Sequence, residues 1–169
     1  MFFPPEMNMS LVNRLRRGWV YPQSIELYQL LHKATIVALA RPDQRILPVL
    51  VCRKAHWTLY PMAKQLGFMV IEMGRQFAGD VGEDEVAELR SELHFQDLVA
   101  GTEPSLKVRD RFRTVLPQHG EKFAEAWQRT SNRTDLVFYI EKLRYETKVV
   151  GRASLMSQFR RVAGQPGGW

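Results

Sequence analysis

Residues 46–77 constrain the fold of this chain most, because they read as a strand, a helix and a strand in succession. An apolar run rich in β-branched residues covers Ile46–Cys52, and a second apolar run covers Phe68–Met73. Between them, the pattern from Thr58 to Gly67 predicts a short helix. A connecting helix returns the chain to its starting side, so the two strands are expected to be parallel.

Cationic and polar residues follow each predicted strand. Arg53, Lys54 and His56 come after the first strand, and Arg75 comes after the second. The C-terminal ends of parallel strands meet at one edge, where open α/β sheets bind their ligands. We therefore predict that these four side chains, together with Gln76, share that edge, and that the four contact phosphate groups.

The charge of the chain favours an anionic partner. Its formal net charge is +6 and its isoelectric point is near 9.7. The charge is uneven, with +5 over residues 1–60, −5 over residues 61–100 and +6 over residues 101–169. This layout is typical of a basic surface with one acidic flank, and nucleic acid is the expected partner.

A second cluster of cations lies in a predicted helix of the C-terminal part. Lys107, Arg109, Arg111 and Arg113 fall within seven residues, and 107 with 111 and 109 with 113 are i,i+4 neighbours. One interpretation is a face that contacts phosphates. The other is a solvated helix face tempered by Asp110, which is the usual role of such charge runs.

The remaining pattern predicts an α/β fold, with α+β as the alternative, whose small sheet is built around one βαβ unit. Three parts are expected: an α/β part over residues 1–100, a helical extension over 101–163 and a mobile tail over 164–169. The first expected helix is Pro22–Ala40, with Ile25, Tyr28, Leu31, Thr35 and Leu39 on one side. A second helix runs from Glu83 to about Leu98, and a third begins at Pro104 and ends before Pro117 and Gly120, which separate it from a segment around Phe123 and Trp127. Two more helices are expected, from Thr134 to about Val150 and over Leu155–Val162.

The N-terminal segment has two interpretations. Arg14, Arg16 and Arg17 with Trp19 are a pattern for backbone contact and stacking, as in proteins that bind single strands. Alternatively, the segment is an arm whose Trp19 packs on the domain, which we favour. A two-stranded unit leaves peptide groups unpaired, so we also expect either a third strand from residues 1–21 or 135–150, or a dimer that extends the sheet.

Cysteine and histidine usage excludes some site types. Cys52 is the one cysteine and lies in an apolar run, so we expect a buried thiol and no disulfide within the chain. The four histidines are far apart and lack metal-ligand spacing, so no zinc site is expected. Neither a signal-peptide core nor a membrane-spanning run is present, which predicts a cytoplasmic protein without a membrane partner.

Three segments carry a resemblance to a known family. They are ELYQLLHKA (Glu26–Ala34), LPVLVCRKAHWT (Leu47–Thr58) and MAKQLGFMVIEMGRQF (Met62–Phe77). In pattern and order, residues 20–77 resemble the later half of a restriction-endonuclease-like fold of the PD-(D/E)XK type. The resemblance implies a helix, a strand, a helix and a strand that follow a catalytic hairpin.

The chain departs from that family where catalysis would occur. Such nucleases place an acidic residue and a (D/E)-x-K triplet on strands before the first shared helix, where the carboxylates hold Mg²⁺. Here Leu11–Pro22, LVNRLRRGWVYP, contains no acid. The resemblance therefore implies a degenerate relative that does not cleave, or a chain that begins late.

An E-x-K triplet occurs elsewhere, at Glu146-Thr147-Lys148, with Asp135 upstream. The functional interpretation is a nuclease site moved toward the C-terminus. Helical periodicity instead predicts charges on different faces of one helix, and we favour that interpretation.

We expect a protein that binds nucleic acid without cutting it and that resembles a truncated or catalytically degenerate endonuclease-like domain. The alternative is a protein–protein module, or a subunit of a homo- or hetero-oligomer, whose sheet edge is completed by a partner chain. A second alternative is a metal-dependent nuclease that uses Asp135, Glu146 and Lys148. No cofactor is expected, and Mg²⁺ enters only with that last alternative.

Overall fold

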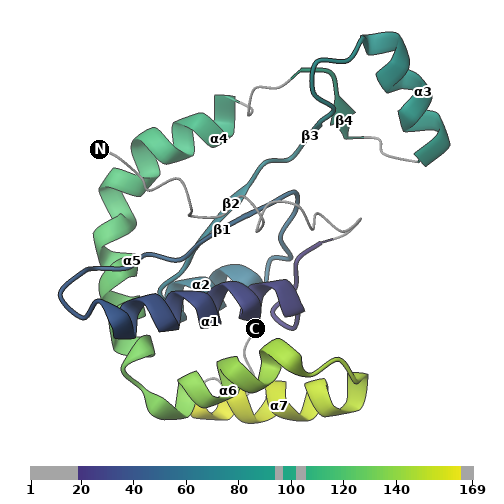
Figure 1. The fold of residues 1–169 in the computed structure, drawn as a ribbon. Coiled ribbons are helices and arrows are strands. Elements are labelled where there is room, and N and C mark those ends of the chain that lie inside the picture. Colours follow the sequence, from purple (N-terminus) through teal and green to yellow (C-terminus); the bar gives the residue numbers. More distant parts are fainter. Residues whose placement is uncertain (1–18, 94–96, 102–105, 165–169) are drawn as a thin grey trace.

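The computed structural model describes residues 19–93, 97–101 and 106–164 (Figure 1). Positions 165–169 of the expected tail lie outside these ranges. In chain order, the elements are α1 (Ile25–Ala40), β1 (Val49–Cys52), α2 (Leu59–Leu66), β2 (Met69–Glu72), β3 (Gln76–Phe77), α3 (Glu83–Leu93), β4 (Leu98–Val99), α4 (Leu106–Asp110), a π-helical turn η2 (Arg111–Val115), α5 (Leu116–Ser131), α6 (Thr134–Tyr145) and α7 (Val149–Val162). The fold is α/β, with a small parallel sheet around one βαβ unit and a helical extension, as predicted.

The βαβ unit is confirmed. β1 pairs with β2 in parallel register, from Val49 opposite Met69 to Cys52 opposite Glu72. The connecting helix α2 ends at Gly67, which adopts a left-handed φ of 87°. This conformation favours glycine, so the sequence signal that ended the predicted helix has a structural cause.

Helices cover both faces of the β1–β2 sheet. One face, with Leu50 and Cys52, joins a core that includes residues of α1, α2, α5, α6 and α7. The opposite face, with Met69 and Ile71, packs with Val108 and partly buried residues of η2 and α5. The helical extension therefore shares a core with the βαβ unit, and α6 packs against both α1 and α7 (Figure 1).

Helix α1 ends at Ala40, as expected for the first helix, but begins at Ile25 and not at Pro22. Its residues Tyr28, Leu31 and Thr35 are buried on one side, as the periodicity predicted. Leu39 was placed on the same side, but its exposed fraction is 61%. The prediction was wrong for Leu39 because it lies in the last turn of α1 beside a pocket, which it lines with Ile46 and Trp127.

The helix expected to run to about Leu98 ends sooner. α3 ends at Leu93, and Leu98–Val99 form β4, which pairs in parallel with β3. Arg90 in α3 donates from Nε to the carbonyl of Leu98 at 2.6 Å. Leu98 is buried, so tertiary burial of this apolar residue competes with continuation of the acidic helix.

The separation expected at Pro117 and Gly120 does not occur. α4, η2 and α5 follow one another without a break from Leu106 to Ser131. Pro117 lies in the first turn of α5, directly after the π-helical turn. A wider turn at this point changes the hydrogen-bond partners that Pro117 would otherwise disrupt, so the helix continues through it.

The helix expected from Thr134 to about Val150 ends sooner, and the shorter helix expected over Leu155–Val162 begins sooner, at Val149. α6 ends at Tyr145, and Glu146 adopts an extended ψ of 114°. The Glu146 carboxylate accepts a hydrogen bond from the backbone N–H of Lys148 at 2.7 Å, which stabilises the turn. Val150 belongs to α7 and not to the helix expected to start at Thr134, and its side chain is exposed.

The expected third strand is present only as a single bridge within the described residues. Val20 forms an isolated parallel bridge with Ala55, beyond the end of β1. Residues 135–150 are helical apart from their turn and supply no strand. The second two-stranded sheet, β3 with β4, was not predicted and lies with α3 away from the main sheet (Figure 1).

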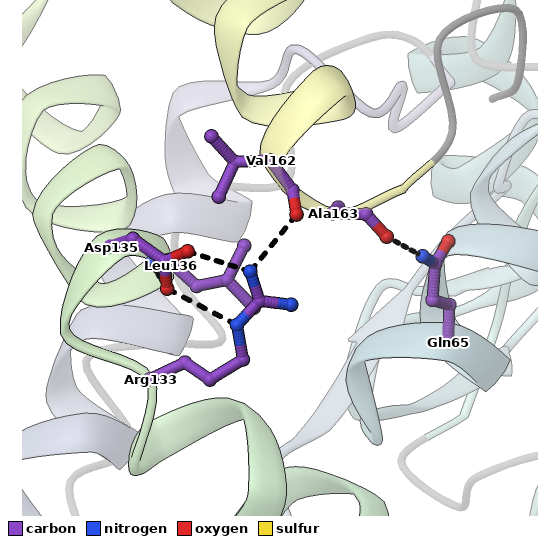
Figure 2. A network of polar contacts seen from close by, with 6 residues as sticks. All are labelled: Gln65, Arg133, Asp135, Leu136, Val162 and Ala163. Atoms are coloured by element: carbon purple, nitrogen blue, oxygen red, sulfur yellow. Dashed lines mark hydrogen bonds and ion pairs between the residues drawn. The ribbon is translucent and has the colours of Figure 1, made fainter.

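Polar contacts fix the C-terminal end of α7 (Figure 2). Arg133 donates to both carboxylate oxygens of Asp135, at 3.1 and 2.6 Å, and to the carbonyl of Val162 at 3.0 Å. Gln65 of α2 donates to the carbonyl of Ala163. These contacts satisfy carbonyls that a helix end leaves without a partner and join α7 to α2 and to the start of α6.

Among the helices of the described residues, none combines the length and the apolar character needed to cross a bilayer.

Candidate nucleic-acid interface

The chain that follows β1 is extended and carries a second extended segment beside it. The Val20 N–H donates to the carbonyl of Lys54 at 2.9 Å, and the His56 N–H donates to the carbonyl of Val20 at 2.8 Å. Val20 packs against the core, and Ala55 is buried. Because side chains alternate along an extended segment, the neighbours of these two residues point the other way, toward solvent.

Four rings gather at this point and form what we call the aromatic surface: Trp19, Tyr21, His56 and Trp57. The Tyr21 ring stacks on the His56 imidazole with 4.7 Å between centroids and 26° between planes. The Trp19 ring contacts the same imidazole edge-on at 6.1 Å. Trp57 is 70% exposed and Trp19 is 51% exposed, so much of this surface faces solvent.

The imidazole of His56 is held by its neighbours. Its Nδ1 lies 2.7 Å from the Thr58 hydroxyl oxygen and accepts a longer hydrogen bond, 3.4 Å, from the backbone N–H of Thr58. Both contacts involve Nδ1, so Thr58 fixes the orientation of the ring. His56 is therefore held in place as one ring of the aromatic surface, at the strand end where the sequence predicted it to lie.

The carboxylate at this edge of the sheet belongs to Glu72. Its Oε1 accepts a hydrogen bond from the backbone N–H of Ala55 at 2.5 Å. The side chain thus continues the hydrogen bonding between β1 and β2 after the strands themselves end. Burial, and then the negative charge of Glu72, raises the pKa of the neighbouring Cys52 thiol to about 12.

Tyr60 connects the strand ends with the cationic helix. Burial raises the pKa of its hydroxyl, and the charge of Glu72 and a hydrogen bond with Glu72 raise it further. The positive charge of Arg111 acts in the opposite direction and lowers this pKa. Arg111 therefore lies within electrostatic range of a residue at the edge where Lys54 and His56 lie.

Arg53, which the sequence predicted as a contact for phosphate, forms an ion pair within the protein. Its Nε lies 2.8 Å from Oδ2 of Asp97, and both side chains are largely buried. Arg53 thus joins the end of β1 to the segment before β4, which is a structural role.

The other predicted cations are available to a ligand. The exposed ones are Lys54, Arg75, Arg109, Arg111 and Arg113. Within the part of the chain that the structure describes, none of these five forms an ion pair. The side chain of Lys107, like residues Arg14, Arg16 and Arg17, lies outside the described residues.

The structure does not bring the nuclease triplet together. Asp135 lies in the first turn of α6, and Glu146 and Lys148 lie in the turn that follows α6. Eleven residues of helix correspond to about 16 Å, which is too far for two carboxylates to hold one Mg²⁺. A hydrogen bond from Arg133 lowers the pKa of Asp135, and Arg133 engages both its oxygens. Across the described residues, no cluster of three His, Cys, Asp or Glu side chains has the arrangement of a metal site.

Sequence reasoning missed Tyr21 and Tyr60 as site residues. For Tyr21 a signal was present, because Trp19 and Tyr21 alternate with Val20 just as Lys54 and His56 alternate with Ala55. Two short segments with the same alternation can pair so that both outward sets lie together. For Tyr60 no local signal exists, since its place depends on how α2 packs beside Glu72.

Comparisons of this chain with models of protein families, with curated proteins and with solved structures found no match.

Proposed function

We propose that this chain binds nucleic acid without cutting it, as a degenerate relative of the endonuclease-like proteins that residues 20–77 resemble. The observation that carries the proposal is the set of five exposed cations that form no ion pair with a described residue, on α4, η2 and the strand ends. Cations that are not neutralised within the protein can release the counterions of a phosphate backbone, which is the main source of affinity in such complexes. As the chain has a single cysteine, a reducing compartment, the cytoplasm, suits it best.

The cations of the helix support a phosphate contact in a second way. η2 places Arg111 and Arg113 in a π-helical turn, and such turns are frequent at functional sites. A π-helical turn contains more residues than an α-helical turn. The i,i+4 neighbours that the sequence predicts therefore do not line up as they would along a regular α-helix. The charge of Arg111 acts on the Tyr60 hydroxyl, which also interacts with Glu72 at the end of β2. Lys54 adds a charge just after β1.

The test is binding of a labelled oligonucleotide, measured by fluorescence anisotropy between about 50 and 200 mM salt. The variant is the triple change of Arg109, Arg111 and Arg113 to Gln. A matched control changes Lys33, Lys64 and Arg161 to Gln, which are also exposed. Both triples reduce the formal net charge by the same amount from +6, so only position differs.

We expect the helix triple to weaken binding. It should also reduce the slope of log K against log salt by up to about 0.9 for each phosphate that the variant no longer neutralises. The control triple should change the slope much less. Equal effects of the two triples would mean that net charge alone acts, and would refute an interface at this position. Loss of thermal stability is checked by circular dichroism before either result is interpreted.

The alternative function is a protein–protein module whose sheet is extended by a strand of another chain. The edge of β2 opposite β1 supports this alternative. Met69 and Met73 donate to carbonyls of the β1 chain, so the peptide groups of Val70 and Glu72 point away from β1. Within the described residues, no strand pairs with that edge of β2. A strand from a second copy or another protein would satisfy these groups.

Amide hydrogen exchange separates this alternative from nucleic-acid binding. If a second copy pairs with β2, the amides of Val70 and Glu72 become protected as the protein concentration rises, in step with the mass from sedimentation. The amide of Ile71, which faces β1, is the internal control. A monomer at all concentrations, with fast exchange at Val70 and Glu72, would contradict pairing between copies.

A further inference from the structure

We propose that the preferred ligand of this chain is a single strand, whose unpaired bases stack on the aromatic surface. This inference rests on the proposed function and adds the class of nucleic acid. It starts from the aromatic surface at the end of β1. Binding of phosphates by the cations would not by itself require these exposed rings.

The backbone holds these rings in place before any ligand arrives. Two hydrogen bonds, 2.9 and 2.8 Å long, fix Val20 beside Ala55, and the residues around them project to one side. The Tyr21 ring covers one side of the His56 imidazole. Rings that are already ordered lose little freedom on binding, which favours affinity.

Exposure is unusual for rings of this size. Trp57 and Trp19 are both more than half exposed, and Tyr21 is partly exposed. Large aromatic side chains are ordinarily buried to a great extent. A stacked base would cover them, and it would do so with little dependence on sequence because every base has a π-face.

The charges around the aromatic surface suit a strand and not an apolar peptide. Lys54 lies in the same segment as His56 and is exposed, and its side chain forms no ion pair with a described residue. The carboxylate of Glu72 accepts a hydrogen bond from the N–H of Ala55. A phosphate beside a stacked base therefore meets a cation, in the combination typical of single-strand grooves.

A duplex cannot use this surface in the same way. In a duplex the faces of each base are covered by the neighbouring pairs, so stacking on a protein ring requires that a pair is first opened. The cations bind either form, whereas the rings favour the form whose bases are already free. We therefore expect single strands to bind more tightly than duplexes of equal length at equal salt.

The experiment compares a labelled single strand, its duplex and a single strand of equal length with abasic sugars, for the wild type and for Trp57→Ala and Trp57→Phe. Trp57→Ala should weaken binding of the single strand about tenfold, because one base no longer stacks. The duplex and the abasic strand should be little affected, and Trp57→Phe should recover part of the affinity. Phe138→Ala is the matched control, since Phe138 is half exposed on α6.

Each outcome decides between the two proposals. If no oligonucleotide binds, the proposed function itself fails. If duplex and single strand bind with salt dependence, but Trp57→Ala binds the single strand like the wild type, the proposed function stands and the stacking inference is overturned. Equal binding of the abasic and the normal strand would overturn it as well.

Discussion

The guanidinium of Arg53 and the carboxylate of Asp97 form an ion pair with 2.8 Å between Nε and Oδ2, and their side chains are 15% and 17% exposed. The pair joins the C-terminal end of β1 to the segment that precedes β4. It therefore connects the βαβ unit with the second small sheet, which otherwise lies apart from it (Figure 1). Arg53, which the sequence predicts to contact a ligand, therefore also stabilises the contact between these two parts of the fold.

We expect Arg53→Ala to destabilise the protein by about 1–3 kcal/mol, because it leaves the largely buried Asp97 without this cation. Arg75→Ala, at an exposed position that forms no ion pair with a described residue, should cost less than about 0.5 kcal/mol. Urea unfolding measures both free energies. In a double-mutant cycle, Asp97→Ala should add little to Arg53→Ala; full additivity would show that the pair contributes nothing.

Gly67 is the second position where the fold depends on one residue. Its φ is 87°, and a Cβ built there would lie 2.1 Å from the backbone nitrogen of Trp127. Gly67→Ala should therefore cost more than about 3 kcal/mol, since backbone strain adds to displacement of α5. Gly74 is a matched control, because its φ is 72° but nothing lies within 4 Å of a Cβ. Gly74→Ala should cost only about 1–2 kcal/mol, and equal losses of stability for the two variants would contradict the close approach.

The βαβ unit could be predicted from the sequence because residues at or near each element boundary determine where that element ends. Gly67 ends α2 through its own φ, and the apolar runs of β1 and β2 are strands buried on both faces. The same reasoning failed at Pro117, where a π-helical turn removes the conflict that a proline normally creates. Nothing in the local sequence indicates that turn.

The break between α6 and α7 shows the same limit. Tyr145-Glu146-Thr147-Lys148 contains neither glycine nor proline, so the pattern continued the helix. In the fold, Arg152 satisfies the carbonyls at the end of α6 and makes the break favourable. The candidate interface was predictable in part: the strand-end residues follow from topology, whereas the roles of Arg53 and Tyr60 depend on partners far along the chain.

Arg152 supports the junction of α1, α6 and α7. It donates to the carbonyls of Leu143 and Glu146 at 2.6 and 2.7 Å, and also to the carbonyl of Gln23. Arg152→Ala should lower the free energy of unfolding by about 2–3 kcal/mol, because these acceptors lose a charged donor. Arg161→Ala, on the exposed side of α7, is the control and should be nearly neutral. A neutral Arg152→Ala would mean that water replaces the guanidinium.

His32 should make stability depend on pH. Burial, and then the positive charge of Arg144, lowers the pKa of His32, whose Nδ1 lies 2.6 Å from a guanidinium nitrogen of Arg144. The unfolded chain then binds a proton at a higher pH than the folded one, so stability is fully present above about pH 6.5 and is lost as the pH falls toward the lowered pKa. His32→Asn should reduce this loss in melting curves measured at several pH values. An unchanged pH dependence would assign it to other groups.

Cys52 should be unreactive in the folded protein. Its side chain is buried in β1, and burial followed by the charge of Glu72 raises the pKa of the thiol to about 12. Only the thiolate attacks disulfide reagents, so the reactive fraction near pH 8 is about 10⁻⁴ even before access is considered.

A chromogenic disulfide reagent should therefore modify Cys52 slowly in buffer and at the rate of a free thiol in urea. Glu72→Gln removes the nearby charge and should accelerate the native reaction if the thiolate fraction limits it. If Glu72→Gln has no effect while reagent uptake follows unfolding, access alone protects Cys52, and rapid modification of the native wild type would contradict its burial in β1.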